Sequence, residues 1–200
     1  MGQLALQHAT VDFSAVAQSL RDEHARFLAK HRDVLVTFGP IRHADQTPAG
    51  YAYQTDFPGT EAEPIRQFLA EDPFAKAGLY RSVTVSGWRC ALPHRQPTAP
   101  VRPGLQGFFF HGIAKPNVTE RRNALADRHR AHLMPKDNTN CLARGGLTEK
   151  TGTEWFGSAM VYEFPDRNVL EQFFSNEPFY TGGIYERVDI YNWQRGEMAP

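Results

Sequence analysis

One segment of this chain occurs twice, and the repeat limits the folds that the chain can adopt. Residues 65–88 align with residues 170–193 at a constant shift of 105 positions, and eight of the 24 aligned pairs are identical. The identical pairs are Gln67/Gln172, Phe68/Phe173, Pro73/Pro178, Phe74/Phe179, Gly78/Gly183, Tyr80/Tyr185, Val83/Val188 and Trp88/Trp193. Such internal similarity indicates two structural units of one kind in tandem, each of about 100 residues.

The hydrophobic pattern predicts the same order of elements, β-α-β-β-α-β, in both halves. Alternating or β-rich apolar runs predict strands, and apolar residues spaced three and four apart predict helices. In the first half the strands are expected at 3–9, 34–38, 51–57 and 80–88, with helices at 12–31 and before Asp72. In the second half they are expected at 107–114, 141–143, 156–164 and 185–193, with helices opening at Asn117 and spanning 166–176. Gly39-Pro40 is expected to be a turn, and Gly145-Gly146 is expected to be either a turn or a place where another backbone segment approaches closely.

A β-α-β-β-α-β unit forms a four-stranded antiparallel sheet with both helices on one face. The other face of each sheet needs a cover, and the second copy can provide it. We therefore predict an α+β chain in which two ferredoxin-like units pack sheet against sheet as an intrachain dimeric α+β barrel around a small cavity. The units are expected at 1–89 and 105–196, joined by a linker at 90–104 that contains four prolines.

The composition excludes several classes of partner. Lysine plus arginine and aspartate plus glutamate both number 22, so the formal net charge is zero and no nucleic-acid partner is indicated. No apolar run reaches the roughly 18 residues of a membrane helix, and the first residues do not resemble a secretory signal. The two cysteines, Cys90 and Cys141, do not occupy matching places in the repeat. A cytoplasmic protein without disulfides is expected.

The repeated segment resembles the YCII-related family of the dimeric α+β barrel superfamily. The matching features are DPF at 72–74 with AGLY at 77–80, EPF at 177–179 with GGIY at 182–185, and the strand ending in Trp88. Arg130-Ala131-His132-Leu133 loosely matches the family's R-x-x-H-L helix motif. The resemblance implies a cleft with a histidine–aspartate pair and a poorly defined range of activities, which includes dehydrochlorination of a chlorinated hydroxyquinol.

The two halves depart from this family pattern in different ways. The family's helix histidine corresponds to His132 in the second half but to Phe27 in the first. The family's acid corresponds to Asp72 in the first half and to Glu177 in the second. We therefore expect that the two halves no longer do identical work.

Asp72 and Glu177 both follow a predicted helix and precede a proline. A carboxylate at the C-terminal end of a helix faces the negative end of the helix dipole, which raises its pKa toward a range that suits acid–base catalysis. The structural alternative is that Asp72 caps a following helical turn. Because glutamate is a poor cap, its presence at the same place favours a requirement for the carboxylate.

Histidines near these acids are the candidate proton carriers. His129 and His132 lie three residues apart on one predicted helix, so both rings can point the same way, and His24 aligns with His129 in the first half. Histidine beside a carboxylate can act as a general acid or base near neutral pH. A packed histidine with one hydrogen bond is the alternative for each of them.

Four further residues are candidates for binding a substrate. His8 and His111 occupy similar points of the opening strands, and Phe109 shares a face with His111 because strand side chains alternate. Tyr185 belongs to a set of aromatic residues that suits a flat ligand. A metal site built from the histidines was considered, but the sequence has no spacing that supports one, so no metal is predicted.

Together these features predict a small, cofactor-independent enzyme. It would perform histidine–carboxylate acid–base chemistry of the lyase, isomerase or cyclase type on a small oxygenated cyclic or aromatic substrate in the barrel cavity, in secondary metabolism or aromatic degradation. The alternatives are a non-catalytic binding or accessory protein and a cofactor-free oxygenase. The expected partner is a small molecule, with a homodimer of the whole chain left open.

Overall fold

The computed structural model describes residues 2–57, 63–149 and 152–199, and both halves have the predicted order of elements. The first half consists of β1 (Gly2–His8), α1 (Gln18–Lys30), β2 (Leu35–Arg42), β3 (Pro48–Thr55), α2 (Glu63–Glu71), α3 (Pro73–Lys76) and β4 (Ser82–Cys90). The second half consists of β5 (Gln106–Ala114), α4 (Thr119–Leu133), β6 (Cys141–Thr148), β7 (Trp155–Phe164), α5 (Arg167–Ser175), α6 (Pro178–Thr181) and β8 (Tyr185–Trp193).

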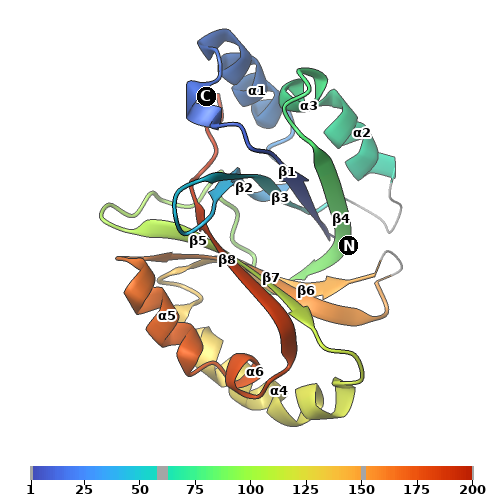
Figure 1. The fold of residues 1–200 in the computed structure, drawn as a ribbon, viewed down its shortest axis with the longest axis vertical. Helices are drawn as coiled ribbons and strands as arrows, with labels where there is room; N and C mark the ends of the chain where they lie inside the picture. Colours follow the sequence, from blue (N-terminus) through green and yellow to red (C-terminus); the bar gives the residue numbers. More distant parts are fainter. Residues whose placement is uncertain (1, 58–62, 150–151, 200) are drawn as a thin grey trace.

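The eight strands form one closed antiparallel barrel in the order β1-β3-β2-β8-β5-β7-β6-β4. Each half contributes four neighbouring strands, and the halves join where β2 pairs with β8 and where β4 pairs with β6. The helices of the first half cover one side of the barrel and those of the second half cover the opposite side (Figure 1). The predicted α+β fold, an intrachain dimeric α+β barrel, is confirmed.

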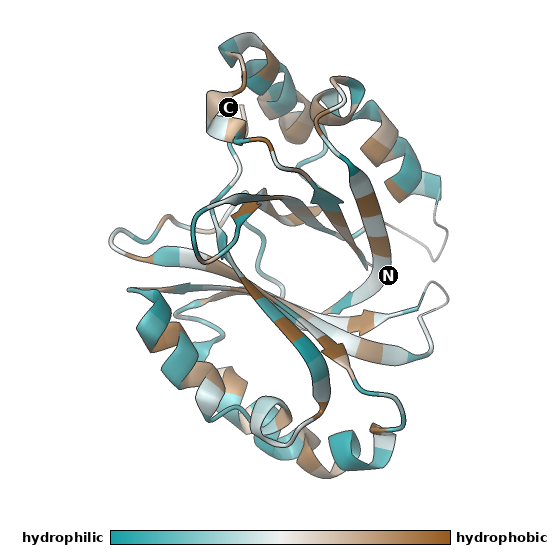
Figure 2. Ribbon diagram, viewed as in Figure 1, coloured by the Kyte–Doolittle hydropathy of each residue, from teal (hydrophilic) through white to brown (hydrophobic). Residues whose placement is uncertain are grey.

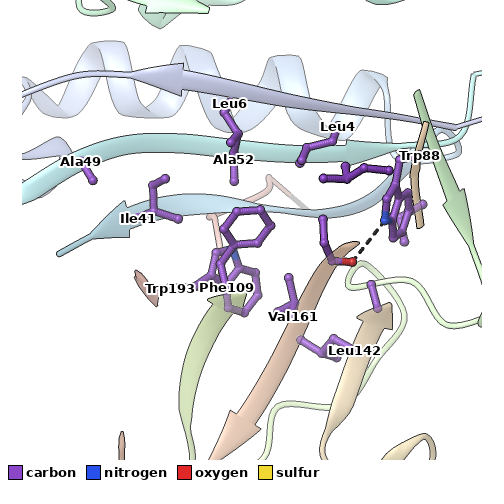
Figure 3. Packing of buried hydrophobic residues seen from close by; sticks show 14 residues of the cluster. Leu4, Leu6, Ile41, Ala49, Ala52, Trp88, Phe109, Leu142, Val161 and Trp193 are labelled. Atoms are coloured by element: carbon purple, nitrogen blue, oxygen red, sulfur yellow. Dashed lines mark hydrogen bonds between the residues drawn. The ribbon is translucent and has the colours of Figure 1, made fainter. Parts of the chain in front are cut away.

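Apolar side chains from both halves fill the interior of the barrel (Figure 3). Trp88 is fully buried, and its indole Nε1 donates a hydrogen bond to the carbonyl oxygen of Ala159 in the other half at 3.2 Å. The members of this interior cluster are Leu4, Leu6, Val36, Ile41, Ala49, Ala52, Trp88, Phe109, Leu142, Ala143, Leu147, Ala159, Val161 and Trp193. Two other clusters lie between each sheet and its helices, whose ribbons carry both hydrophilic and hydrophobic positions (Figure 2).

Both dipeptides lie within strands, so the turn expected at Gly39-Pro40 is wrong, whereas the close backbone approach that was the alternative at Gly145 is found. β2 continues through Gly39, beside which the chain after β8 extends the sheet: Gln194 N–H donates to the Pro40 oxygen at 3.1 Å, and Gly196 N–H donates to the Phe38 oxygen at 2.9 Å. A Cβ on Gly39 would clash with the backbone of Gln194. β6 continues through Gly145, which pairs with Cys90 of β4, and a Cβ there would clash with the Arg89 oxygen.

The start of α4 also differs from the prediction. Asn117 has a φ of 58°, in the left-handed region, and the helix begins at Thr119 without a side-chain cap. Asparagine tolerates this conformation better than most residues, which accounts for its place in a turn rather than at the N-cap.

The segment between β4 and β5 is tied to the body of the protein. Gln96 is buried, and its Oε1 accepts a hydrogen bond from the Phe38 N–H at 2.7 Å. The buried carboxylate of Glu163 pairs with Arg102 of this segment and with Arg195, each at 2.9 Å. Both cysteines are free. Among the described residues, no helix has the length and apolar character that a membrane span requires.

Candidate functional site

Asp72 and Glu177 are both fully buried, and each caps the short helix that follows it. The Asp72 Oδ1 accepts a hydrogen bond from the Phe74 N–H at 2.8 Å. Glu177 accepts from two amides, those of Phe179 and Tyr180, each at 2.9 Å. Glutamate therefore does serve as a cap here, because its longer side chain reaches two N–H groups. These contacts hold both carboxylates in fixed positions between helix and sheet.

In the first half, the second carboxylate oxygen of Asp72 accepts hydrogen bonds from three side chains. Its Oδ2 accepts from Gln7 Nε2 at 3.0 Å, Tyr53 OH at 2.8 Å and Tyr80 OH at 3.3 Å. His24 Nε2 lies 2.8 Å from the Tyr53 oxygen and 3.7 Å from Asp72 Oδ1, so the phenol forms the hydrogen-bonded link between the imidazole and the carboxylate. Since the phenol donates to Asp72, it accepts the Nε2 proton of a neutral His24.

His24 is locked in place and kept neutral. Its ring stacks on Phe74 with centroids 3.9 Å apart, and only 4% of the residue is exposed. Burial lowers the pKa of His24 to about 4, an effect that the Asp72 charge opposes only in part. A neutral histidine whose one proton is used in a buried bond has a structural role.

The C-terminal segment closes the space above His24. The Ala199 N–H donates to the Ala25 oxygen at 3.1 Å, and Met198 packs against the helix–sheet core. Gly196 lies so close to Tyr51 and Phe38 that a Cβ would clash with both side chains. The hollow that remains beside His24 measures about 80 Å³.

In the second half, the imidazole and the carboxylate pair directly. His129 Nδ1 lies 2.6 Å from Glu177 Oε1, and the His129 ring stacks on Phe179 with centroids 3.8 Å apart and planes within 4°. In the tautomer that carries its proton on Nδ1, His129 donates this hydrogen bond to Glu177 and keeps a lone pair on Nε2. No described residue makes a hydrogen bond to Nε2, and the side chain is 13% exposed. His129 is thus oriented by one nitrogen and available at the other.

The available face of His129 borders a pocket of about 150 Å³. A cavity of about that size can hold a benzene ring. Aromatic and polar side chains share its walls, and the Tyr185 hydroxyl donates to Ser158 Oγ at 3.0 Å at one edge. The lining residues are Ala91, Arg122, Ala126, His129, Arg130, Leu133, Arg144, Gly145, Gly146, Trp155, Ser158, Met160 and Phe179.

The strand register explains why the second half has the larger pocket. Ala5 of β1 pairs with Tyr53, whereas the matching Phe110 of β5 pairs with Met160. By the same register, Ser158 of β7 occupies the place of Tyr51 in β3. Two phenols of the first half are therefore replaced by side chains without a ring. With Met160 at the place of Tyr53, no phenol links His129 to Glu177, and the imidazole contacts the carboxylate directly.

The remaining candidates lie apart from this pair. His132 Nε2 bonds the backbone oxygen of Phe173 at 3.0 Å, and its ring stacks on that phenylalanine, so packing rather than Glu177 holds it. His111 is buried beside Phe109 on the barrel side of the sheet, 3.9 Å from Asp189, and burial lowers its pKa to about 4. His8 lies half-buried at the end of β1.

The carboxylates do not lie in a cavity inside the barrel, where the sequence analysis placed the chemistry. The barrel interior holds the apolar cluster around Phe109 and Trp88, whereas Asp72 and Glu177 lie on the outer side of the sheets, under the helices. Alternate strand residues face opposite sides, so one sheet provides both a solid interior and an outer site. The candidate site belongs to the helix–sheet layer of one half.

Several pocket residues were not singled out in the sequence. Arg122 precedes His129 by seven residues, two helical turns, so helical spacing alone could have placed both on one face. Ser158 and Met160 could be found only from the sheet register. Two larger hollows, of about 460 and 510 Å³, border the segment between the halves, and neither is lined by His129 or Glu177. We place the site where a fixed base borders a pocket.

Residues 108–194 match the family model of the YCII-related domain. This chain carries a YCII-related domain. The matched residues run from within β5 to the end of β8 and include His129 and Glu177. No curated protein matches the chain.

Solved structures with the same architecture are distant in sequence. A candidate monooxygenase of Fusobacterium nucleatum has a TM-score of 0.64 at 6% identity, over 98% of this chain and 92% of that one. A haem-binding protein of Thermus thermophilus has a TM-score of 0.56 at 11% identity, over 98% and 92%. The 5-chloro-2-hydroxyhydroquinone dehydrochlorinase of Burkholderia phenoliruptrix has a TM-score of 0.42 at 23% identity, over 45% and 95%. The first two show that the fold spans both units.

A haem does not fit the pocket beside His129. At about 150 Å³ the pocket suits one ring, not a macrocycle of four. Moreover, Arg122, Ser158 and Arg144 make much of the wall polar. Within residues 2–57, 63–149 and 152–199, no three histidine, cysteine, aspartate or glutamate residues gather as a metal site would require.

Proposed function

We propose that the YCII-related domain of this chain is a small enzyme whose proton carrier is His129. The supporting observation is the contact of 2.6 Å between Nδ1 of His129, a residue that lines a ring-sized pocket, and the buried Glu177. The substrate would be a small oxygenated cyclic or aromatic compound, and the reaction a lyase, isomerase or cyclase step. No cofactor is required by this chemistry.

The proton balance of such a step is simple. His129 Nε2 takes a proton from a carbon or hydroxyl of the substrate, and the imidazolium is stabilised by the negative charge of Glu177. The electron pair left on the substrate shifts into the ring system or expels a leaving group. His129 then returns the proton at a second position or to the departing group. A positioned base of this kind contributes about 10²–10⁴-fold in rate.

Only the second half would work in this way. In the first half His24 bonds Tyr53, which in turn donates to Asp72, and the C-terminal segment covers the imidazole. The duplicated unit would then serve as the second wall of the barrel. Proteins with this fold, such as chlorite dismutases, include small-molecule enzymes, and an enzymatic role for this chain agrees with that precedent.

A binding or accessory role is the second candidate. The observation that favours it is the small pocket, which a ligand could fill without reacting. Oxygenation without a cofactor is a variant of the first proposal, since it begins with the same proton removal. Association of two chains, location in the cytoplasm and a place in secondary metabolism or aromatic degradation stay predictions.

Deuterium exchange tests the proposal without knowledge of the natural reaction. A panel of hydroxylated cyclic ketones and quinols would be incubated with the protein in D2O, and NMR would follow loss of substrate C–H signals. We expect His129→Gln to slow exchange by about 10²-fold or more and Glu177→Gln to slow it less. His132→Gln is the matched control on the same helix and should exchange like the wild type.

The outcomes separate the candidates. Exchange that persists in His129→Gln, or that disappears in His132→Gln, would contradict the assigned base. Binding of panel members without exchange, detected by calorimetry, would favour the accessory role. Circular dichroism of each variant checks that the fold is kept.

A further inference from the structure

Arg122 of α4 lies at the pocket wall, and no carboxylate among the described residues pairs with its charge. Its Nε is buried, and no described residue accepts a hydrogen bond from it. The guanidinium lies over the Trp155 ring, 4.4 Å from the centroid. Burial lowers the pKa of Arg122, and the charges of Arg130 and Arg89 act in the same direction. A partly buried cation with unmet donors is costly unless something else supplies acceptors.

The other charges around the pocket are already matched. Arg144 makes two bonds to Asp137, at 2.6 and 2.7 Å, and Arg130 pairs with Asp127 at the surface. Glu177 is occupied by His129 and two amides. Arg122 therefore gives the empty pocket a local excess of positive charge.

The size and shape of the pocket limit which anions can reach Arg122. Trp155 and Phe179, with centroids 6.1 Å apart, provide aromatic surface at the wall, and a volume of about 150 Å³ admits one ring. A guanidinium recognises the planar, bidentate geometry of a carboxylate. Arg122 and His129 are seven residues apart on one helix, which places their Cα atoms about 10 Å apart along its axis.

We propose that this pocket binds a small aromatic or cyclic carboxylate, with the carboxylate on Arg122 and the reacting end of the ring at His129 Nε2. The placement of the reacting end of the ring rests on the proposed function, since His129 defines which end reacts. The anion site itself stands on the contacts of Arg122 alone. Arg122 thus selects among ring compounds by charge.

Two ligands that differ only in charge test the proposal. 4-Hydroxybenzoate and 4-hydroxybenzamide have the same ring, and titration calorimetry at neutral pH measures both. We expect the wild type to bind the benzoate about 10- to 100-fold more tightly, as one charge-assisted pair would give. Arg122→Met should abolish this preference and leave amide binding largely unchanged. Arg128→Met, an exposed arginine of the same helix, is the matched control.

A second measurement covers the case in which Arg122→Met does not fold. Added salt should weaken benzoate binding to the wild type and leave amide binding unaltered, because only the former depends on charge. Equal binding of the two ligands, no binding of the benzoate, or a preference that survives Arg122→Met would overturn the proposal.

The anion site and the acid–base function fail in different ways. His129→Gln should keep the preference for benzoate while it loses deuterium exchange. A wild-type protein that catalyses exchange but binds the benzoate and the benzamide equally would refute the anion site alone. Persistence of exchange in His129→Gln, with the benzoate preference intact, would refute the base alone.

Discussion

Acidification should destabilise this protein through His24 before its carboxylates are protonated. The pKa of His24 falls from an ordinary value of 6.5 to about 4 on folding, because the ring is buried. Between these two values the unfolded chain binds a proton at this residue and the folded chain does not. Proton binding therefore favours the unfolded state, so the stabilisation is complete above pH 6.5 and is lost as the pH falls toward 4.

The size of the effect follows from the two pKa values. Each unit of difference corresponds to 1.36 kcal/mol, so His24 accounts for a loss of about 3 kcal/mol in the free energy of unfolding. That is a large share of the stability of a typical domain. His111, whose pKa burial also lowers to about 4, should add a loss of the same sign.

Urea unfolding of the wild type and His24→Gln, at about pH 7 and about pH 4.5, isolates the contribution of His24. Glutamine can still donate to Tyr53 but does not titrate in this range. We expect the loss of stability on acidification to be about 2–3 kcal/mol smaller in His24→Gln. His43→Gln, at an exposed position, is the control. An equal loss in wild type and His24→Gln would show that His24 is not neutral in the folded protein.

Three further predictions concern the barrel and the linking segment. Trp88→Phe should lower stability by about 1–3 kcal/mol, because it removes the donor to the Ala159 oxygen; urea unfolding measures this. Trp193→Phe should cost less, since the buried Trp193 Nε1 has no partner among the described residues; an equal cost would contradict the role of the bond. Glu163→Ala should lower the free energy of unfolding by about 3 kcal/mol and raise hydrogen exchange around Arg102, because two arginines lose their acceptor. Unchanged exchange would show that Glu163 does not hold the linking segment in place.

The asymmetry between the halves has a physical basis in the fused chain. A homodimer must carry identical sites, whereas a tandem repeat can change one copy alone. Tyr53 converts the first histidine–carboxylate pair into a buried network, and the segment after β8 covers it. The second copy keeps a direct contact between His129 and Glu177, and His129 lines a pocket. Structural stability and chemistry can thus be assigned to different halves of one barrel.

The repeat and the strand periodicity were enough to predict the fold. An amphipathic helix or half-buried strand carries its own periodicity, and the need to cover the bare sheet faces left few arrangements for two copies. The same reasoning brought Asp72, Glu177, His24 and His129 forward. It could not rank His129 above His132, because both lie on one helix face and only the packing on Phe173 separates them.

What the sequence by itself determined is the local order of elements, the duplication and the set of polar residues near each helix end. The tertiary structure alone decided which of them meet. Side chains of β3 and β7 reach the site through the pairing of strands far apart in the chain, and no local pattern records it. The tertiary structure also decided that the barrel interior is solid, since filling it depends on how residues far apart in the chain fit together.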